Sequence, residues 1–206
     1  MNELSDDTID KKFIKPRYIL TGGIASGKST TLNMMKEYGI EVIDADVISH
    51  KVFAENEDAI REVFELTTSG DILRKEVSDL IFSKPKKRFQ LEALLHPIIK
   101  SEISKQEKEL QDKVYVIDIP LYFEKRSDKQ DGDFVITLDT NYETQVVRLM
   151  KRNNFTKDQA DKRILSQIPN AVKVKKADYV LYNSGTIDEL KSAVKIMLDK
   201  VFSKGA

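Results

Sequence analysis

Residues 22–30, GGIASGKST, constrain the fold and chemistry of this chain more than any other segment. Gly22, Gly27, Lys28 and Ser29 occupy the fixed positions of the motif G-x-x-x-x-G-K-[ST]. A short apolar run precedes the motif and a helical pattern follows it, which is the strand–loop–helix context that the motif requires. A chance match on a glycine-rich turn is the alternative, and both flanks argue against it. The segment therefore predicts a loop that binds the phosphates of a nucleoside triphosphate.

The physics of anion binding explains these residue types. A loop that wraps phosphates must point its amide hydrogens inward, and glycine allows the backbone angles and the close approach. The following helix directs the positive end of its dipole at the anion. We expect Lys28 to reach the β- and γ-phosphates of ATP and act in catalysis, and Ser29 to bind the bridging magnesium ion. The expected nucleotide-binding residues are Gly22, Gly23, Ile24, Ala25, Ser26, Gly27, Lys28, Ser29 and Thr30.

Ala25 is the unexpected residue of this loop, because many loops of this kind have glycine at its position. If Ala25 has a positive φ, its methyl group costs about 1 kcal/mol. We therefore expect Ala25→Gly to be tolerated and to leave ATP binding unchanged. A large loss of affinity would show that the methyl group has a role of its own.

Apolar runs alternate with longer helical stretches along the chain, a pattern that favours a parallel sheet with crossover helices. The helix after the motif is expected at residues 29–38, closed by Gly39. The sequence thus predicts an α/β fold with a five-stranded, parallel, doubly wound sheet, whose ligands bind beyond the carboxyl ends of the strands. The strands are expected at residues 18–21, 41–44, 113–119, 133–138 and 178–181.

Two helical stretches interrupt this alternation. Residues 57–111 are too long for a simple crossover, so we expect them to form a helical side domain. A helical hairpin is expected at residues 141–176, and residues 148–176 would form a lid that excludes water during transfer. The other parts are a polar N-terminal tail at residues 1–16 and a nucleotide-binding core at residues 17–56, 112–147 and 177–206.

The formal net charge of the chain is zero, but the lid segment is strongly basic. Between Arg148 and Lys176 there are nine Lys and Arg residues against two Asp, a local charge of +7. A basic cluster in a neutral protein suggests a local anionic ligand, whereas a nucleic-acid surface would spread basic charge more widely. A solvated helical face is the alternative explanation.

Two aspartates close the second expected strand, in the sequence VIDADVISH. Asp44 and Asp46 stand two residues apart, so on a continuing strand both would face one side, beside the phosphate loop. An aspartate there can orient an acceptor hydroxyl and receive its proton, in a reaction where positioning contributes most. The alternative is that one of them caps the next helix.

With these motifs in view, the chain resembles a known family. GGIASGKST followed by GIEVIDADVISH is similar to the dephospho-CoA kinases, which complete coenzyme A synthesis. LEALLHPII, DIPLYFE, TQVVRLMKRN and ADYVLYNSG resemble later family motifs in the right order, and the likeness covers about residues 17–200. The resemblance implies a P-loop kinase with a helical acceptor-binding insertion. It also implies ATP-dependent phosphorylation of the ribose 3′-hydroxyl of dephospho-CoA.

The resemblance also implies roles for individual residues. Asp46 matches the family's base, and Arg148 and Arg152 would stabilise the transferred phosphate. Asn183 and Gly185 would line the adenine pocket. The residues implied on the acceptor side are Asp46, Arg74, His96, Pro120 and Leu121.

Several positions depart from the family pattern or allow a second explanation. The family's Leu-Asp-Arg reads ILR at residues 72–74, so its aspartate is absent, and Tyr122 replaces a leucine. Asp118 stands where a magnesium ligand can follow a strand, but a hydrogen bond at the strand end is favoured. A structural hydrogen bond explains His96 as well as an acceptor contact does. Glu124 is a candidate for ordering a nearby basic group.

Composition excludes several classes of protein. The absence of cysteine excludes disulfides, thiolate zinc sites and a cysteine nucleophile. There is no apolar run of about 18 residues and no signal-peptide core, so we expect a cytoplasmic protein that binds neither membrane nor nucleic acid. No heptad seam is evident, so a monomer is expected.

Two other functions stay open at this point. One is a nucleoside or nucleotide kinase on the same frame. The other is a nucleotide-dependent switch protein that binds a partner and hydrolyses slowly. Guanine-reading GTPases typically carry Asn-Lys-x-Asp, which this sequence lacks, and the basic helical segment fits a lid better than a switch loop.

Overall fold

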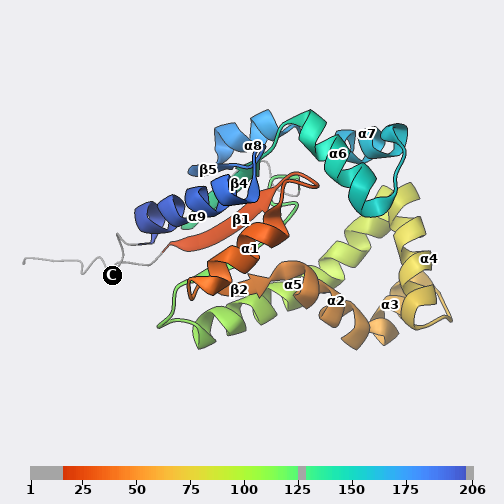
Figure 1. The fold of residues 1–206 in the computed structure, drawn as a ribbon. Coiled ribbons are helices and arrows are strands. Elements are labelled where there is room, and N and C mark those ends of the chain that lie inside the picture. The colour runs from red at the N-terminus through yellow and green to blue at the C-terminus, as the bar shows by residue number, and fades with distance from the viewer. Residues whose placement is uncertain (1–15, 125–128, 203–206) are drawn as a thin grey trace, which may run out of the picture.

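The computed structural model of the protein describes residues 16–124 and 129–202. Its centre is a five-stranded sheet in the order β2-β3-β1-β4-β5, with every neighbouring pair parallel (Figure 1). This confirms the predicted α/β class and the five parallel strands. The polar tail expected at residues 1–16 lies, apart from Pro16, outside the described residues. The strands are β1 (Arg17–Gly22), β2 (Glu41–Asp44), β3 (Tyr115–Asp118), β4 (Asp133–Asp139) and β5 (Tyr179–Tyr182).

Helices form the crossovers and the two additions to the sheet. They are α1 (Lys28–Glu37), α2 (Ala45–Glu55), α3 (Glu57–Phe64), α4 (Gly70–Ser83), α5 (Pro85–Glu109), α6 (Tyr142–Asn153), α7 (Lys157–Leu165), α8 (Asn170–Lys176) and α9 (Ile187–Val201). In the part of the chain that the structure describes, no helix combines the length and apolarity that a membrane span needs.

The sheet separates two hydrophobic cores, because successive side chains of a strand point to opposite faces. Leu20 and Ile136 pack on one face with residues of α1 and α9, such as Met35 and Val194. The neighbouring Ile19 faces the other side, in a core that extends into α2, α3, α4 and α5. Burial of each such side chain contributes about 1.5–3 kcal/mol, so the alternation fixes which helices cover which face.

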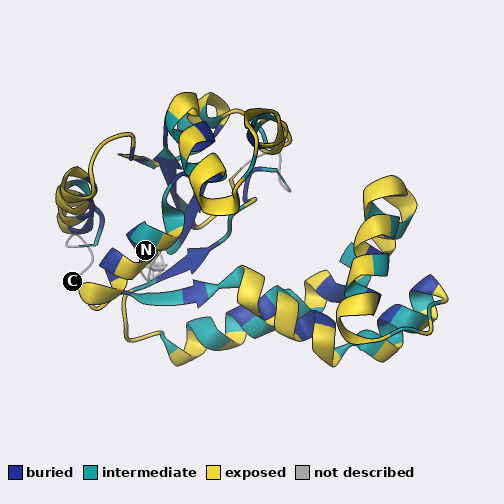
Figure 2. Ribbon diagram, turned by 45° about the vertical axis from the view of Figure 1, so that its right-hand side comes forward, coloured by how far each residue is buried: buried dark blue, intermediate teal, exposed yellow. Residues whose placement is uncertain are grey.

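The helices α2 to α5 extend away from the sheet as an arm (Figure 2). The arm has its own buried side chains, including Ile60, Phe64, Leu73 and Val77, and they join the core on that side of the sheet. Pro85 opens α5, where its missing N–H costs nothing. The stretch expected as a helical side domain therefore contains α3, α4 and α5.

Residues 141–176, expected as a helical hairpin, form three helices. The Asn141 side chain caps α6 by accepting from Thr144 N at 2.8 Å. Thr156 and Gln159 form a capping box at the start of α7. In Figure 1, α6 and α7 stand across from α4, so the basic helices face the tip of the arm.

Candidate active site

Most of the residues predicted for the site line one cavity of about 990 Å³ at the carboxyl end of the sheet. It brings together the phosphate loop, the first turn of α2, the helix α6, with which the predicted lid begins, and the loop after β5. The predicted residues in its lining are Gly22, Gly23, Ile24, Ala25, Ser26, Gly27, Lys28, Ser29, Thr30, Asp46, Pro120, Arg148, Arg152, Asn183 and Gly185. Arg74, His96 and Leu121 are not part of this lining.

Gly27 shows why the loop demands glycine at its second fixed position. Its φ is 92°, and it is the residue from which α1 starts. A Cβ there would collide with the side-chain amide of Asn183. The Gly27 carbonyl accepts from Thr31 N at 3.0 Å, so α1 begins directly beneath the loop and aims its positive end at the cavity.

Ala25 has the positive φ on which its predicted cost depends, with a value of 58°. Its surroundings explain the methyl group. Ile24 and Ala25 pack against a small cluster formed by Val146, Leu149 and Ala160 of the lid helices. Contact with the lid therefore offsets part of the backbone cost at Ala25.

Lys28 extends from the start of α1 to Asp118 at the end of β3. Its Nζ lies 2.8 Å from both carboxylate oxygens, with hydrogen-bond geometry to Oδ2, so Asp118 Oδ1 is buried without a hydrogen-bond partner. Burial raises the pKa of Asp118 above its usual range, against the lowering effect of Lys28, while the charges of Asp44 and Asp46 raise it further. The carboxyl groups thus meet at one edge of the sheet.

The strand expected at residues 41–44 is confirmed, and it does not continue through Asp46. Strand β2 ends at Asp44, because the Asp44 Oδ1 accepts from Asp46 N at 2.9 Å and Val47 N at 3.0 Å and starts α2 there. Capping of the helix, the alternative explanation, is therefore the role of Asp44. Asp46 lies exposed in the first turn of α2 and lines the cavity.

The lid arginines differ in their contacts. Arg148 donates to the backbone carbonyls of Asn183 at 3.1 Å and Ala25 at 3.4 Å, and to the Asn183 Oδ1 at 3.3 Å. Arg152 is exposed and donates to Asn153 Oδ1 at 2.9 Å. Asn183 is 4% exposed, and its Nδ2 donates to Ser26 O at 2.7 Å. Arg148 and Asn183 therefore bond to each other and to neighbouring carbonyls of the phosphate loop.

The predicted acceptor residues are more scattered. Arg74 of α4 lies 3.4 Å from both the Nδ1 and the backbone oxygen of His50, and its guanidinium sits 5.2 Å from the centre of the Phe53 ring. His96 of α5 lines a separate cavity of about 460 Å³ with Phe89. Leu121 is 37% exposed in the loop after β3.

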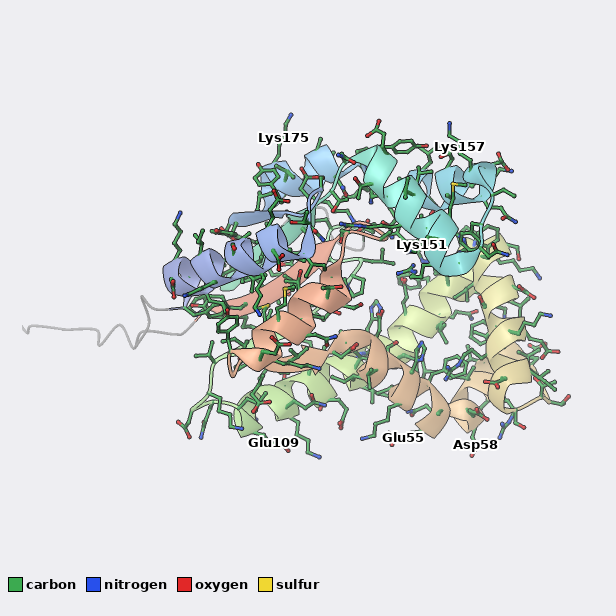
Figure 3. The ribbon with its side chains drawn as sticks, in the orientation of Figure 1. Glu55, Asp58, Glu109, Lys151, Lys157 and Lys175 are labelled. Carbon is green, nitrogen blue, oxygen red and sulfur yellow. The ribbon has the colours of Figure 1, made fainter. Side chains whose placement is uncertain are left out.

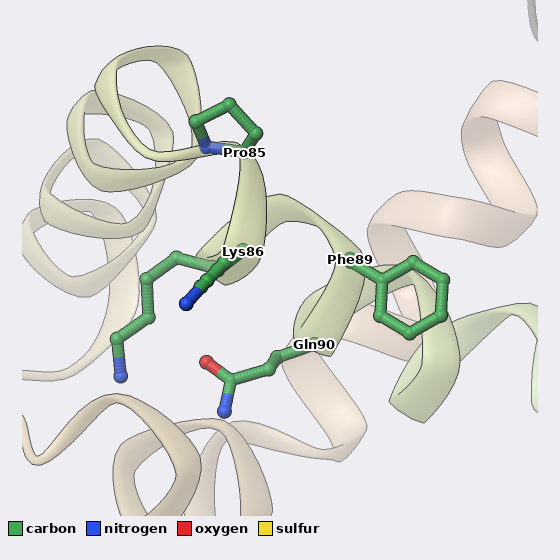
Figure 4. A pocket seen from close by; sticks show the side chains of 5 residues that line it. Pro85, Lys86, Phe89 and Gln90 are labelled. Atoms are coloured by element: carbon green, nitrogen blue, oxygen red, sulfur yellow. The ribbon is translucent and has the colours of Figure 1, made fainter.

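A third cavity, of about 640 Å³, lies at the start of α5 (Figure 4). Pro85, Lys86, Lys87, Phe89 and Gln90 line it. Phe89 also lines the cavity around His96, so the two cavities adjoin along α5.

Sequence reasoning missed several residues of the central cavity. Lys151, Gln167, Ile187 and Leu190 also line it. Lys151 belongs to the basic cluster, and Figure 3 shows it with Lys157 on the lid, opposite the acidic Glu55 and Asp58 of the arm. The position of Lys151 in the cluster was the available signal, whereas nothing local marks the two apolar residues.

A buried ion pair connects the lid to the sheet. Lys173 of α8 is 1% exposed, and its Nζ lies 2.5 Å from Glu124 Oε1. Glu124 therefore orders a basic group, as the sequence suggested. Tyr122, which replaces the family's leucine, is also buried, and its hydroxyl donates to Asp133 Oδ2 at 2.6 Å.

Comparison with known proteins gives one consistent family. The sequence profile described as "Dephospho-CoA kinase" matches residues 18–189. A protein named "Dephospho-CoA kinase" from Bacillus cereus is 40% identical over 189 residues, which covers 87% of this chain and 94% of that protein. Its namesake from Wolinella succinogenes is 36% identical and covers 88% of this chain and 92% of its own length.

Solved structures agree. "Crystal structure of TT1252 from Thermus thermophilus" matches with a TM-score of 0.80 at 29% identity, covering 90% of this chain and 98% of that one. "Dephospho-CoA kinase from Campylobacter jejuni" matches with a TM-score of 0.69 at 28% identity, covering 91% and 98%. Profile, sequence relatives and fold thus coincide over nearly the whole described chain, and the protein belongs to the dephospho-CoA kinase family.

Proposed function

We propose that this protein transfers the γ-phosphoryl group of ATP to the ribose 3′-hydroxyl of dephospho-CoA, giving coenzyme A and ADP. Family membership supports the acceptor. One structural observation supports the chemistry: a phosphate loop, an exposed aspartate and two lid arginines line the same cavity. Binding of the triphosphate on the loop places its terminal phosphate between the aspartate and the lid.

On the acceptor side, Asp46 is the proposed base. The 3′-oxygen of the ribose forms a bond to the γ-phosphorus, the bond from phosphorus to the β–γ bridging oxygen breaks, and ADP leaves with that electron pair. Asp46 orients the hydroxyl and receives its proton. Its place in the first turn of α2 keeps it on a rigid element at the cavity wall.

On the donor side, Lys28 and the lid neutralise charge. Lys28 leaves or shares its contact with Asp118 to reach the β- and γ-phosphates. Arg148 and Arg152, with Lys151 beside them, stabilise the phosphoryl group as it moves. Asn183 and Gly185 stand at the adenine end of the same cavity, where the side chain of Asn183 is held on the loop.

The residues present also fit a magnesium ion. Among the described residues, no group of three or more His, Cys, Asp or Glu could hold a metal. Magnesium, however, needs only one or two protein ligands together with substrate phosphates and water. Asp118 offers a buried oxygen without a hydrogen-bond partner, and Ser29 offers a hydroxyl at the cavity. The ion would neutralise charge on the phosphates.

Acceptor recognition is proposed for the 57–111 insertion, which forms the α3 to α5 part of the arm, through Arg74 and His96, together with Pro120 and Leu121 in the loop after β3. The lid is proposed at residues 148–176. A monomer in the cytoplasm remains the expected state, and light scattering on a sizing column checks the mass in solution.

A coupled assay for ADP release with ATP, magnesium and dephospho-CoA tests the proposal. We expect acceptor-dependent turnover with dephospho-CoA and none above background with nucleosides or nucleoside monophosphates. Turnover with the latter alone would favour the nucleoside or nucleotide kinase alternative. Slow hydrolysis that no acceptor accelerates would favour a switch protein and contradict the proposal.

A further inference from the structure

The backbone of Ile24, in the middle of the phosphate loop, is held from both sides by glutamines of the lid region. Ile24 N–H donates to the Gln167 Oε1 at 2.7 Å, and the Gln145 Nε2 donates to the Ile24 carbonyl at 2.7 Å. Both bonds are at the short end of the range for N–H···O. Since a carbonyl can only accept and an N–H can only donate, each partner fixes which way its glutamine amide points.

The two glutamines lie on different elements of the helical region 141–176. Gln145 lies in the first turn of α6, and Gln167 follows α7. Gln145 is 4% exposed, and the loop leaves room for it: a Cβ on Gly23 would lie 2.9 Å from the Gln145 Nε2 and 2.6 Å from Asn170 Oδ1. The Ile24 side chain packs into the lid cluster that contains Val146 and Leu149. Ile24 thus contacts both α6 and the segment that follows α7.

The bond from Gln145 also sets the direction of the next amide hydrogen. The Ile24 carbonyl and the Ala25 N–H belong to one trans peptide group, in which they point in opposite directions. Gln145 is not part of the lining of the nucleotide cavity, whereas Ala25 is. Across residues 16–124 and 129–202, the Ala25 N–H donates to no protein acceptor. The bond therefore turns this N–H away from Gln145, toward the place where phosphate oxygens bind.

We propose that Gln145 and Gln167 are positioning residues for phosphoryl transfer. They hold the Ile24 peptide groups so that the Ala25 N–H faces the phosphates, and they seat the lid on the loop. They touch the loop backbone and contribute no group to the reacting atoms. The inference rests on the proposed donor chemistry, and ADP binding tests it separately from turnover.

Two variants of Gln145 separate this role from simple packing. Gln145→Glu keeps the shape but replaces the donor with an oxygen that repels the Ile24 carbonyl. Gln145→Leu removes the donor without adding charge. Each variant loses a buried hydrogen bond and leaves the Ile24 carbonyl unsatisfied. We therefore expect both variants to raise the ADP dissociation constant about tenfold or more. Calorimetric titration of ADP measures it, and the KM for dephospho-CoA should change less than about twofold, since Gln145 bonds to the phosphate loop and not to a residue proposed for the acceptor.

The dependence on pH distinguishes the two variants. Burial raises the pKa of a carboxyl group introduced at this site, and the protonated form regains an O–H donor. We therefore compare the ADP affinity of Gln145→Glu with that of the unmodified protein at the same pH. When the pH is lowered from about 8 to about 5.5, this relative affinity should rise several-fold. Gln145→Leu should show no such recovery. Equal pH profiles for the two variants, or ADP binding like that of the unmodified protein, would overturn the proposal.

Gln167 gives a second, independent test should the Gln145 variants fail to fold. Gln167→Leu is expected to weaken ADP binding about fivefold or more, and the double variant Gln145→Leu with Gln167→Leu to lose less than the product of the single losses. Gln111→Leu, at an exposed glutamine before β3, is the matched control and should bind ADP normally. Unchanged binding in Gln167→Leu, or strictly multiplicative losses, would count against a shared action on Ile24.

Discussion

The proposed donor side, which is the phosphate loop, and the proposed acceptor side, which is the arm of helices α2 to α5, are built in different ways. The donor side is one short loop whose backbone is braced by Gln145, Gln167, Arg148 and Asn183. The proposed acceptor side has large apolar side chains exposed to solvent: Phe82 is 93% exposed and Phe89 is 73% exposed. A loop held by hydrogen bonds suits the phosphates, which are the same in every turnover. Helices exposed to solvent suit a long acceptor that must enter and leave. Substitutions on the two sides should therefore fail in different ways.

The largest effect is expected at Lys28, on the donor side. Lys28→Met removes the charge that faces the phosphates and should lower kcat/KM for ATP by about a thousandfold or more. The fold should survive, because burial already raises the pKa of Asp118, which can take up a proton when its partner is lost. Steady-state kinetics gives the loss and circular dichroism checks the fold. Lys51→Met, at an exposed lysine of α2, is the control and should behave normally.

Asp46 lies between the proposed donor and acceptor sides. Its substitution should lower kcat without changing the affinity for ADP. Asp46→Asn keeps the size of the side chain but cannot accept the proton, so kcat should fall by about a hundredfold or more. The ADP dissociation constant should stay within about twofold of the original. Asp44→Asn is a matched control, because the amide oxygen can still cap α2. Equal losses of rate and ADP affinity in Asp46→Asn would assign this residue to binding instead.

A substitution on the arm should change the KM for dephospho-CoA and leave the KM for ATP unchanged. Arg74→Ala is expected to raise the KM for dephospho-CoA about tenfold, since a cation that meets an anionic acceptor contributes more than a solvated ion pair. The KM for ATP should not move. Arg88→Ala, which removes an exposed arginine paired with Glu92, is the comparison. An equal rise in the KM for dephospho-CoA and the KM for ATP would contradict separate donor and acceptor sides.

Ala25 offers a finer test of the donor side. Ala25→Gly removes the cost of about 1 kcal/mol at φ 58° but also the methyl contact with the lid cluster. These terms oppose each other, so the free energy of unfolding should change by less than about 0.5 kcal/mol and the ATP affinity by less than about twofold. Chemical denaturation and ADP titration measure the two quantities. A large loss of affinity would make the methyl group part of the phosphate grip.

The smallest effect is expected where the arm meets the sheet, away from both sides. Burial, aided by Glu107, raises the pKa of Tyr115 to about 12. The folded state therefore keeps the phenol proton longer than the unfolded state does, and this stability is lost as pH rises from about 10 to about 12. Solvent screening at this partly exposed side chain should hold the loss below about 1 kcal/mol. Denaturation at several alkaline pH values should show a shallower decline for Tyr115→Phe.

Local sequence predicted the parts of the site that obey local rules. The phosphate loop and its flanking strand and helix follow from residue types at fixed spacing, whereas the positive φ at Ala25 was only a condition that the structure supplied. Asp44 and Asp46 were harder, because an aspartate after a strand can either continue the strand or cap a helix, and the two alternatives have similar local energies. In the structure, α2 starts at Ala45, so Asp44 is its N-cap.

Contacts over long sequence distances could not be predicted. Nothing near Gln145 indicates that its amide meets Ile24, because the two residues are 121 positions apart. For Glu124 the sequence suggested a basic partner but not Lys173, and it did not indicate the cavity residues Ile187 and Leu190. Only the packing of the whole sheet brings these groups to one edge.

The brace on the phosphate loop has a consequence for synthesis of the chain. The hydrogen-bond partner of Ile24, Gln167, is synthesised 143 residues later, and the partner of the Ser26 carbonyl, Asn183, is synthesised 157 residues later. The loop emerges from the ribosome early, but its partners emerge in the last third of the chain, and contacts of such long range form late in folding. A nascent chain halted before Asn183 should therefore carry the full motif and still bind nucleotide poorly.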